Sequence, residues 1–396
     1  MTPPLRILTL STLFPHAGAP NFGIFVERQT AELNRRADAD VTVVSPVGLP
    51  PWPLRKLSRY QQVTDLPTHE LWNGLKLFRP RFMLIPGMSG RSNPDRIFRA
   101  VLPLVRQLHE ESPFDLIDAE FFYPDGPVAM RLAESLDIPF SIKARGADIH
   151  HWASQSGCRE QIVAAAEKAA GLLAVSEALK QDMIDLGMPG DKITVHYTGV
   201  DQTLFQPTDR DKAKGELGVS GPLFICAGAL IPRKNQALVI EAMTAFSEAR
   251  LILAGSGPEE KNYRRLAAQL GVSERVQFAG NVPHDKLASL AAAADISILV
   301  SRSEGLANAW VEALACGTPI VISAAGGARE LLANPVAGRI VAENSNAIVE
   351  AIESILDNPP DQQKVRDSVS KFSWKANGDQ LLDHFQRIAK VPSCAP

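Results

Sequence analysis

The stretch DISILVSRSEGLANAWVEALACGTPIVI, residues 295–322, contains a complete predicted strand–helix–strand unit. Residues 295–300 and 319–322 are short, largely apolar runs, as expected for parallel strands that are buried on both faces. Between them lies a polar, glycine-containing loop, followed by a helical pattern that begins near Asn308. Strand, helix and strand in this order favour a parallel sheet that is covered by helices.

The same alternation extends along nearly the whole chain. Strand patterns occur at residues 5–10, 41–45, 115–119, 139–143 and 171–175, and again at 223–227, 250–254 and 275–278. Helical patterns such as 24–36, 125–136 and 177–186 lie between the strands. The polar segment 206–222, which contains Pro and Gly at its ends, separates the two series. Because 396 residues are enough for two cores, we predict two α/β domains.

The composition excludes several other classes of protein. Hydrophobic residues make up 45% and charged residues 21%, which argues against a disordered or fibrous chain, and the net charge of −3 argues against a nucleic-acid-binding protein. No apolar run approaches the ~18–20 residues of a membrane-spanning helix. The four cysteines are far apart and form no C-x-x-C motif, so we expect free thiols rather than a zinc site. We therefore expect a cytoplasmic protein whose first apolar run is a strand and not a signal peptide.

Residues 51–106, the basic–apolar segment, depart from this charge balance. They contain ten basic and three acidic residues, a local net charge of +7. The large apolar residues interleaved with these charges include Trp52, Trp72, Phe78, Phe82, Met83, Met88 and Phe98. Such a pattern favours contact with the inner face of an anionic membrane or with a lipid-phosphate substrate. An Arg-rich, solvated face is the equally supported alternative.

The loops that follow the predicted strands contain the candidate ligand-binding residues, because ligands bind at the carboxyl ends of parallel strands. Glu304 and Glu312 are separated by seven residues, and Gly305 follows the first of them. Two carboxylates can accept hydrogen bonds from vicinal hydroxyls. The backbone amides of residues 305–309 suit sugar hydroxyls or a phosphate.

A second loop, after residues 223–227, begins at Gly228 and brings Arg233 and Lys234 to the start of a helix. Adjacent cations at that position suit a diphosphate, although a solvated basic pair explains them equally well. The segment LAGSGPEE, residues 253–260, has Glu260 in place of the third glycine of a dinucleotide fingerprint. The loop at 11–23 does not match that fingerprint either, which argues against a nicotinamide-dependent dehydrogenase.

Taken together, these motifs resemble family 4 of the retaining glycosyltransferases. The resemblance is carried by residues 228–234, 254–260, 278–282, 294–295 and 303–319, and by 14–29, 144–148, 175–180 and 197–207 near the N-terminus. It implies the GT-B fold, with two Rossmann-like domains facing across a cleft and a last helix, 374–390, that crosses back to the first domain. The predicted domains are an acceptor-binding domain, 1–205 plus 374–396, and a donor-binding domain, 206–373.

The resemblance also implies roles for the candidate residues. Glu304, Lys234 and Arg233 are the implied catalytic residues: Glu304 holds the donor sugar and the two cations neutralise the leaving diphosphate. Glu312 is implied to bind the nucleotide ribose, and the backbone near Val282 the base. The other implied donor-binding residues are Gly305, Leu306, Ala307, Asn308, Gly228 and, from the first domain, Gly23.

Three positions depart from the family pattern. Ala229 stands where the family often has Arg, which leaves open whether Arg233 replaces that phosphate contact. Arg145 stands where the family often has the His of a His-Gly-x-Asp motif that ends here at Asp148. We expect Arg145, Asp148 and nearby His150 to line the cleft on the acceptor side. Thr198 replaces Asn in an Asn-Gly-Val-Asp motif, which is a milder change.

The resemblance implies a UDP- or GDP-linked sugar donor and no metal or other cofactor. It further implies a saccharide or polyprenyl-phosphate-linked acceptor of the cell envelope or of exopolysaccharide synthesis. In the implied retaining mechanism the leaving phosphate itself accepts the proton of the acceptor, so neither glutamate is a nucleophile. Two alternatives stay open: an inverting enzyme with His16 as general base, and a catalytically impaired sugar-nucleotide-binding protein.

Overall fold

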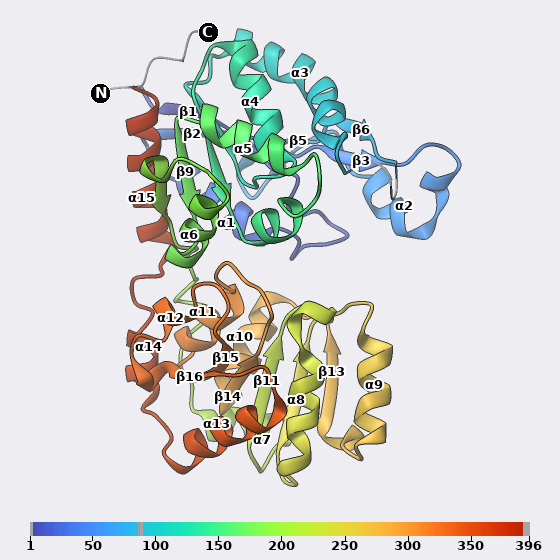
Figure 1. Cartoon of the computed structure of the whole chain (residues 1–396), viewed down its shortest axis with the longest axis vertical. Helices are drawn as coiled ribbons and strands as arrows, with labels where there is room; N and C mark the ends of the chain where they lie inside the picture. Colours follow the sequence, from blue (N-terminus) through green and yellow to red (C-terminus); the bar gives the residue numbers. More distant parts are fainter. Residues whose placement is uncertain (1–2, 86, 88–89, 391–396) are drawn as a thin grey trace. The chain divides into compact units, whose positions relative to one another are not determined.

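The computed structural model describes residues 3–85, 87 and 90–390. It divides into two compact units, Met1–Gly199 with Trp374–Pro396, and Val200–Ser373. Each unit contains a parallel or largely parallel sheet, which confirms the predicted α/β class (Figure 1). Met88 of the basic–apolar segment and residues 391–396 of the predicted first domain lie outside the described residues.

The first unit is built on an eight-stranded sheet of order β10-β9-β8-β7-β1-β2-β5-β4. Its strands are β1 (Leu5–Leu10), β2 (Ala39–Val44), β4 (His69–Trp72), β5 (Leu75–Phe78), β7 (Leu116–Ala119), β8 (Phe140–Ala144), β9 (Gly171–Ala174) and β10 (Ile193–Val195). All neighbours pair in parallel except β4 and β5. A separate parallel pair consists of β3 (Val47–Leu49) and β6 (Arg81–Met83).

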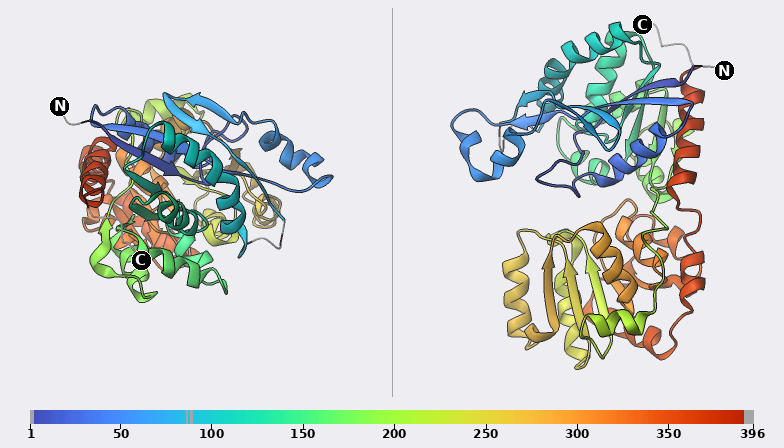
Figure 2. Two further views of the ribbon diagram at one scale, coloured as in Figure 1. Left: turned by 90° about the horizontal axis from the view of Figure 1, so that it is seen from above. Right: turned by 180° about the vertical axis from the view of Figure 1, so that it is seen from behind.

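The helices of this unit come from several parts of the chain. They are α1 (Ile24–Asn34), α2 (Ser58–Thr64), α3 (Asn93–Glu111), α4 (Asp125–Leu136), α5 (Arg159–Lys168), α6 (Glu177–Asp185) and α15 (Trp374–Ile388). Figures 1 and 2 show α15 beside α1 and the sheet, where Arg36, two residues after α1, bonds Asp379 of α15 at 2.6 Å. Leu381, Phe385 and Ile388 of α15 bury themselves in the core with Ile7. In contrast, α2 projects from the rest of this unit (Figure 1).

The second unit is a six-stranded, fully parallel sheet of order β13-β12-β11-β14-β15-β16. Its strands are β11 (Leu223–Ala227), β12 (Arg250–Ala254), β13 (Val276–Gly280), β14 (Ile296–Leu299), β15 (Ile320–Ser323) and β16 (Gly338–Val341). Its helices are α7 (Arg210–Glu216), α8 (Gln236–Ala242), α9 (Glu260–Gln269), α10 (His284–Ala293), α11 (Asn308–Ala315), α12 (Ala328–Leu331), α13 (Ser345–Asp357) and α14 (Gln362–Asp367). Buried aliphatic side chains of β11, β12 and α10 form one of its cores.

The boundary between the units lies at 199/200, six residues before the predicted 205/206. The amide of Val200 donates to the carbonyl of Phe372 at 2.8 Å, and Arg366 donates to the carbonyls of Gln202 and Phe205. These contacts tie residues 200–205 to the end of the second unit. The polar composition of residues 206–222 led us to predict a boundary at 205/206. The hydrogen bonds instead include residues 200–205 in the second unit.

The β4–β5 hairpin was not predicted, although its turn has a sequence signal. Asn73 and Gly74 adopt φ values of 47° and 84°, the left-handed conformations that a tight Asn-Gly turn requires. The hairpin places part of the basic–apolar segment at the edge of the main sheet. In the described part of the chain, no helix combines the length and the apolar character needed to cross a membrane.

The candidate active site

The loops after β11 and β14 bring the three predicted catalytic residues of the second unit together. Lys234 Nζ lies 2.5 Å from Glu304 Oε1, and Arg233 NH1 lies 3.4 Å from Glu304 Oε2. The Arg233 guanidinium also donates to the carbonyl of Ser303. The backbone carbonyl of Arg233 accepts a hydrogen bond from the amide of Arg302 at 2.9 Å. Glu304 is buried, with 8% of its surface exposed. One carboxylate therefore holds two cations that come from a different loop.

Close glycine packing positions the loop that supplies these cations. A Cβ at Gly255 would lie 2.0 Å from the carbonyl oxygen of Gly228, and one at Gly257 would lie 2.2 Å from that of Leu230. The amide of Leu230 donates to the carbonyl of Ser256 at 2.9 Å. The glycines of the incomplete fingerprint thus allow close backbone packing that fixes the loop after β11. Ala229 lies on this loop with an exposed side chain and contributes no charge.

Close glycine packing also holds the loop after β14, and the sequence analysis missed it. Gly326 has φ +51°, and a Cβ there would lie 2.3 Å from the Glu304 carbonyl oxygen. The amide of Gly327 donates to the carbonyl of Gly305 at 2.8 Å. Leu306 and Ala307 are buried behind this contact, and α11 begins at Asn308, the residue predicted from the helical pattern. A glycine pair after a predicted strand was the available signal.

Glu312 lies one turn into α11 and is held by a residue that was not predicted. Its Oε1 is 2.9 Å from Nε2 of His284, the first residue of α10, and each side chain is 14% exposed. The His284 ring packs edge-on against Phe205, with ring centroids 4.9 Å apart. Val282 lies on the loop between β13 and α10, two residues before His284. His284 follows a strand and begins a helix. The rule that ligands bind at the carboxyl ends of parallel strands would therefore have selected it.

In the first unit, Gly23 directly precedes α1 and has a left-handed conformation, with φ +66°. A Cβ at this position would lie 2.4 Å from the carbonyl oxygen of Leu13. The loop after β1 therefore packs directly against the first turn of α1. Only glycine allows both the conformation and this close approach.

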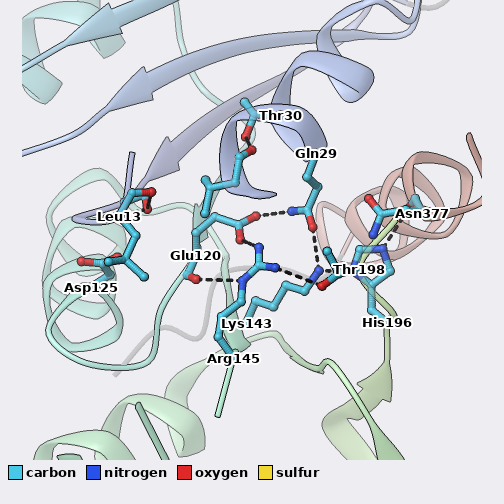
Figure 3. A network of polar contacts seen from close by, with 12 residues as sticks. Leu13, Gln29, Thr30, Glu120, Asp125, Lys143, Arg145, His196, Thr198 and Asn377 are labelled. Carbon is cyan, nitrogen blue, oxygen red and sulfur yellow. Dashed lines mark hydrogen bonds and ion pairs between the residues drawn. The ribbon is translucent and has the colours of Figure 1, made fainter. Parts of the chain in front are cut away.

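Arg145 belongs to a buried polar network at the ends of β7 and β8 (Figure 3). Its guanidinium pairs with the Glu120 carboxylate and lies 3.5 Å from Thr198 Oγ1. Gln29 of α1 donates to the same carboxylate and accepts from Lys143 Nζ at 2.6 Å. Arg145 and Lys143 hold the pKa of Glu120 below its usual value although burial alone would raise it. The 7% exposure of the Arg145 side chain leaves it facing mostly inward.

The network continues from Lys143 to the C-terminal helix. Lys143 Nζ lies 2.7 Å from His196 Nδ1, and His196 Nε2 lies 2.9 Å from the carbonyl oxygen of Asn377 in α15. Burial, followed by the charge of Arg145, lowers the pKa of Lys143 well below its ordinary value. These contacts join α1, β8, the residue that follows β10, and α15, which are far apart in the sequence.

Asp148 is fully buried and shapes a turn instead of lining a ligand site. Its carboxylate accepts the backbone amides of Phe122 at 2.9 Å, Arg145 at 3.0 Å and Gly146 at 2.8 Å. Burial raises its pKa against the effect of these hydrogen bonds. Our expectation of a cleft residue overlooked that an Asp side chain in a loop after a strand often accepts hydrogen bonds from backbone amides of the same turn. His150 is partly exposed and contacts Asp182 of α6 at 2.8 Å.

His16 lies in the loop after β1. Burial and the nearby Arg79 guanidinium lower its pKa, which favours the neutral imidazole at pH 7. Among the described residues, Nδ1 is buried without a hydrogen-bond partner, and no carboxylate contacts the ring. A histidine base is usually oriented by such a carboxylate.

Comparison with known proteins identifies both halves of the chain. Residues 24–204 match the family model Glycosyltransferase Family 4, and residues 207–373 match Glycosyl transferases group 1. TuaC of Bacillus subtilis, whose name assigns it to teichuronic acid biosynthesis as a glycosyltransferase, is 26% identical over 400 residues. That match covers 98% of this chain and 100% of TuaC.

Two solved structures have the same two-domain fold. Sucrose-phosphate synthase from Thermosynechococcus elongatus matches with a TM-score of 0.80 at 20% identity, over 97% of this chain and 99% of that chain. HepE of Anabaena in complex with UDP-glucose matches with a TM-score of 0.69 at 22% identity, over 98% of each chain.

Proposed function

Since this chain is a glycosyltransferase of the GT-B type, we propose that it transfers a hexosyl group from a nucleoside diphosphate sugar with retention of configuration. The observation that carries the proposal is the contact of Lys234 and Arg233 with Glu304, beside the first turn of α11. Two cations and a helix N-terminus together stabilise the charge that develops on a leaving diphosphate. A catalytic metal ion is not required for that purpose.

The donor would compete with Glu304 for the two cations. Its diphosphate takes hydrogen bonds from Lys234 and Arg233, and Glu304 then remains beside the sugar, whose hydroxyls and oxocarbenium-like charge it can stabilise. The amides of residues 305–308 add hydrogen bonds to the same sugar. Glu312 binds the ribose, and the backbone at Val282 contacts the base. Gly228 permits close approach of the donor because it has no side chain.

The proposal of retention is supported by His16 in the loop after β1, whose ring contacts no carboxylate in the described part of the chain. In the proposed mechanism the acceptor hydroxyl attacks the face from which the diphosphate leaves, and a phosphate oxygen takes its proton. The neutral state of His16 favours one second candidate, an inverting enzyme that uses this imidazole as base. NMR of the anomeric proton in the product distinguishes the two, because inversion changes its coupling constant.

The acceptor is proposed to be a saccharide or a polyprenyl-phosphate-linked saccharide of the cell envelope or of exopolysaccharide synthesis. The name of TuaC supports this class. Trp52, 65% exposed, with Leu54 and Leu57, lies beside the exposed Arg55 and Lys56. Apolar and basic side chains together in the segment that precedes α2 suit an anionic bilayer, here the inner face of the plasma membrane.

A donor screen tests the proposed activity. UDP- and GDP-linked hexoses are added to the purified protein, and the melting temperature and the release of free nucleotide are measured. A true donor raises the melting temperature, because it binds only the folded state. Stabilisation without hydrolysis or transfer would favour a catalytically impaired sugar-nucleotide-binding protein, in which Ala229 has weakened the site. The absence of any response would contradict the nucleotide-sugar proposal.

Sedimentation with vesicles tests the membrane contact. Vesicles with ~30% anionic lipid should retain the wild-type chain, and W52S/L57S should weaken retention, since each buried apolar side chain contributes about 1.5–3 kcal/mol. Neutral vesicles are the control for the contribution of Arg55 and Lys56. Equal binding of both proteins to both vesicles would contradict the proposed contact.

A further inference from the structure

We propose that His284 is a positioning residue that orients Glu312 toward the ribose of the donor and thereby sets the preference for a ribonucleotide over a deoxyribonucleotide. This inference rests on the proposed function, which makes Glu312 the ribose ligand, but it assigns a role to a residue outside the motifs of the sequence analysis. The His284–Glu312 pair lies in the second unit, between the starts of α10 and α11.

The two oxygens of the Glu312 carboxylate have different surroundings. His284 Nε2 lies 2.9 Å from Oε1 of Glu312. Among the described residues, Oε2 has no hydrogen-bond partner, and it is not enclosed by protein. One oxygen is thus occupied by the imidazole, and the other is available to accept a hydrogen bond from a hydroxyl group.

The imidazole itself has little freedom to turn. Phe205 packs edge-on against it at 4.9 Å, and the Phe205 carbonyl is held by Arg366, which also bonds the carbonyl of Ala315 at the end of α11. His284 Nδ1 is buried and has no partner in the described part of the chain. In the described part of the chain, the contact of Nε2 with Glu312 is therefore the hydrogen bond that this ring orientation allows.

Positioning matters here because a glutamate side chain has three rotatable bonds. Without the imidazole, the carboxylate can rotate away from the ribose or bond water. Binding of a hydroxyl group then has to fix the glutamate side chain, at a cost in conformational entropy. A hydrogen bond to a charged group is worth more than a neutral one, and it depends strongly on geometry. We expect the loss of His284 to cost about tenfold in nucleotide affinity, all of it in recognition of the ribose hydroxyls.

Titration calorimetry with UDP and GDP, and with their 2′-deoxy and 3′-deoxy forms, tests the inference. The wild type should bind its preferred nucleotide at least about tenfold more tightly than one of the deoxy forms. H284L keeps the apolar contact with Phe205 but removes the donor, and should reduce that ratio to below about twofold. H284Q keeps an N–H donor and should recover most of the ratio. D285N, at the exposed neighbouring position, is the matched control.

A double-variant cycle separates positioning from a general structural effect. If His284 acts through Glu312, then H284L/E312Q should bind no more weakly than E312Q alone. Additive losses, or an H284L variant that keeps the full ribose preference, would overturn the inference while leaving the donor proposal intact. A wild-type chain that binds neither UDP nor GDP would overturn both, because Glu312 would then have no ribose to bind.

Discussion

The two units contain polar clusters of similar composition in different surroundings. Each cluster pairs basic side chains with a glutamate at the carboxyl ends of parallel strands: Lys234 and Arg233 with Glu304 in the second unit, and Arg145 with Glu120 in the first. In the second unit, Lys234 is 13% and Arg233 39% exposed, so both cations can reach a ligand. In the first unit Lys143, Gln29 and Glu120 are fully buried, and Gln29 bonds each of the other two (Figure 3).

The difference teaches that charge type and strand-end position do not identify a ligand site by themselves. A buried cluster must satisfy its own hydrogen bonds, because an unpaired polar group in the interior is costly. An accessible cluster can exchange an internal partner for a ligand. We therefore propose that the network of the first unit contributes to stability and that the cluster of the second contributes to catalysis.

The largest expected effect comes from removing the most enclosed cation of the second cluster. K234A should lower kcat/KM for glycosyl transfer by about 10²–10³-fold, because the leaving diphosphate loses a fixed positive charge. Steady-state kinetics with the donor found in the screen measure this loss. K261A, at an exposed position in α9, is the matched control. A K234A variant with more than a third of wild-type activity would contradict the assignment.

The corresponding change in the first unit should affect folding. K143M leaves Gln29 Oε1 and His196 Nδ1 buried without their donor, so the free energy of unfolding should fall by about 2–4 kcal/mol. Urea denaturation measures this change. K168M, which removes the exposed pair with Glu134, should cost less than about 1 kcal/mol. Equal destabilisation by both variants would break the distinction between buried and accessible clusters.

Asp125, a buried carboxyl group of the first unit, should make the stability of the protein depend on pH. Burial raises the pKa of this carboxyl group to about 8, whereas an unfolded aspartate titrates near pH 3.9. The folded state therefore retains a proton that the unfolded state has lost between these values. The resulting stabilisation is complete below pH 4 and is lost as the pH rises through 8.

Measured from pH 5 to pH 8, the free energy of unfolding of the wild type should fall relative to D125N. The slope should be at most about 1.4 kcal/mol per pH unit, the value for one proton. D383N, at an exposed position of α15, is the control and should follow the wild type. Parallel pH profiles of wild type and D125N would show that Asp125 titrates normally.

The smallest expected effect concerns the position where the family motif is broken. R233A should lower kcat/KM by about tenfold, less than K234A, because the more exposed guanidinium is better screened by water. If Arg233 replaces the missing arginine, the double variant A229R/R233A should recover part of the loss. Failure of A229R to restore any activity in the R233A background would mean that the two positions are not interchangeable.

Local patterns were sufficient for much of the fold. The bounds of β1, β11 and β12 match the predicted strands residue for residue, because each is a short apolar run between polar loops. In contrast, β10 and β16 were missed, because each is an edge strand with one fully buried residue and lacks the continuous apolar run of the predicted strands. The sequence patterns put Glu304, Lys234 and Arg233 in loops that follow strands, and the structure brings these side chains into contact.

The sequence by itself determined the parallel α/β class, the two series of strands and the loops that carry the candidate catalytic residues, because these depend on short-range periodicity. Only the tertiary structure decided which polar groups meet. Lys143 and Gln29 are 114 residues apart, His284 and Glu312 are 28 apart, and Asp148 turns inward to cap its own loop. Such contacts depend on strand order and helix packing, and these bring distant residues together in ways that no local pattern records.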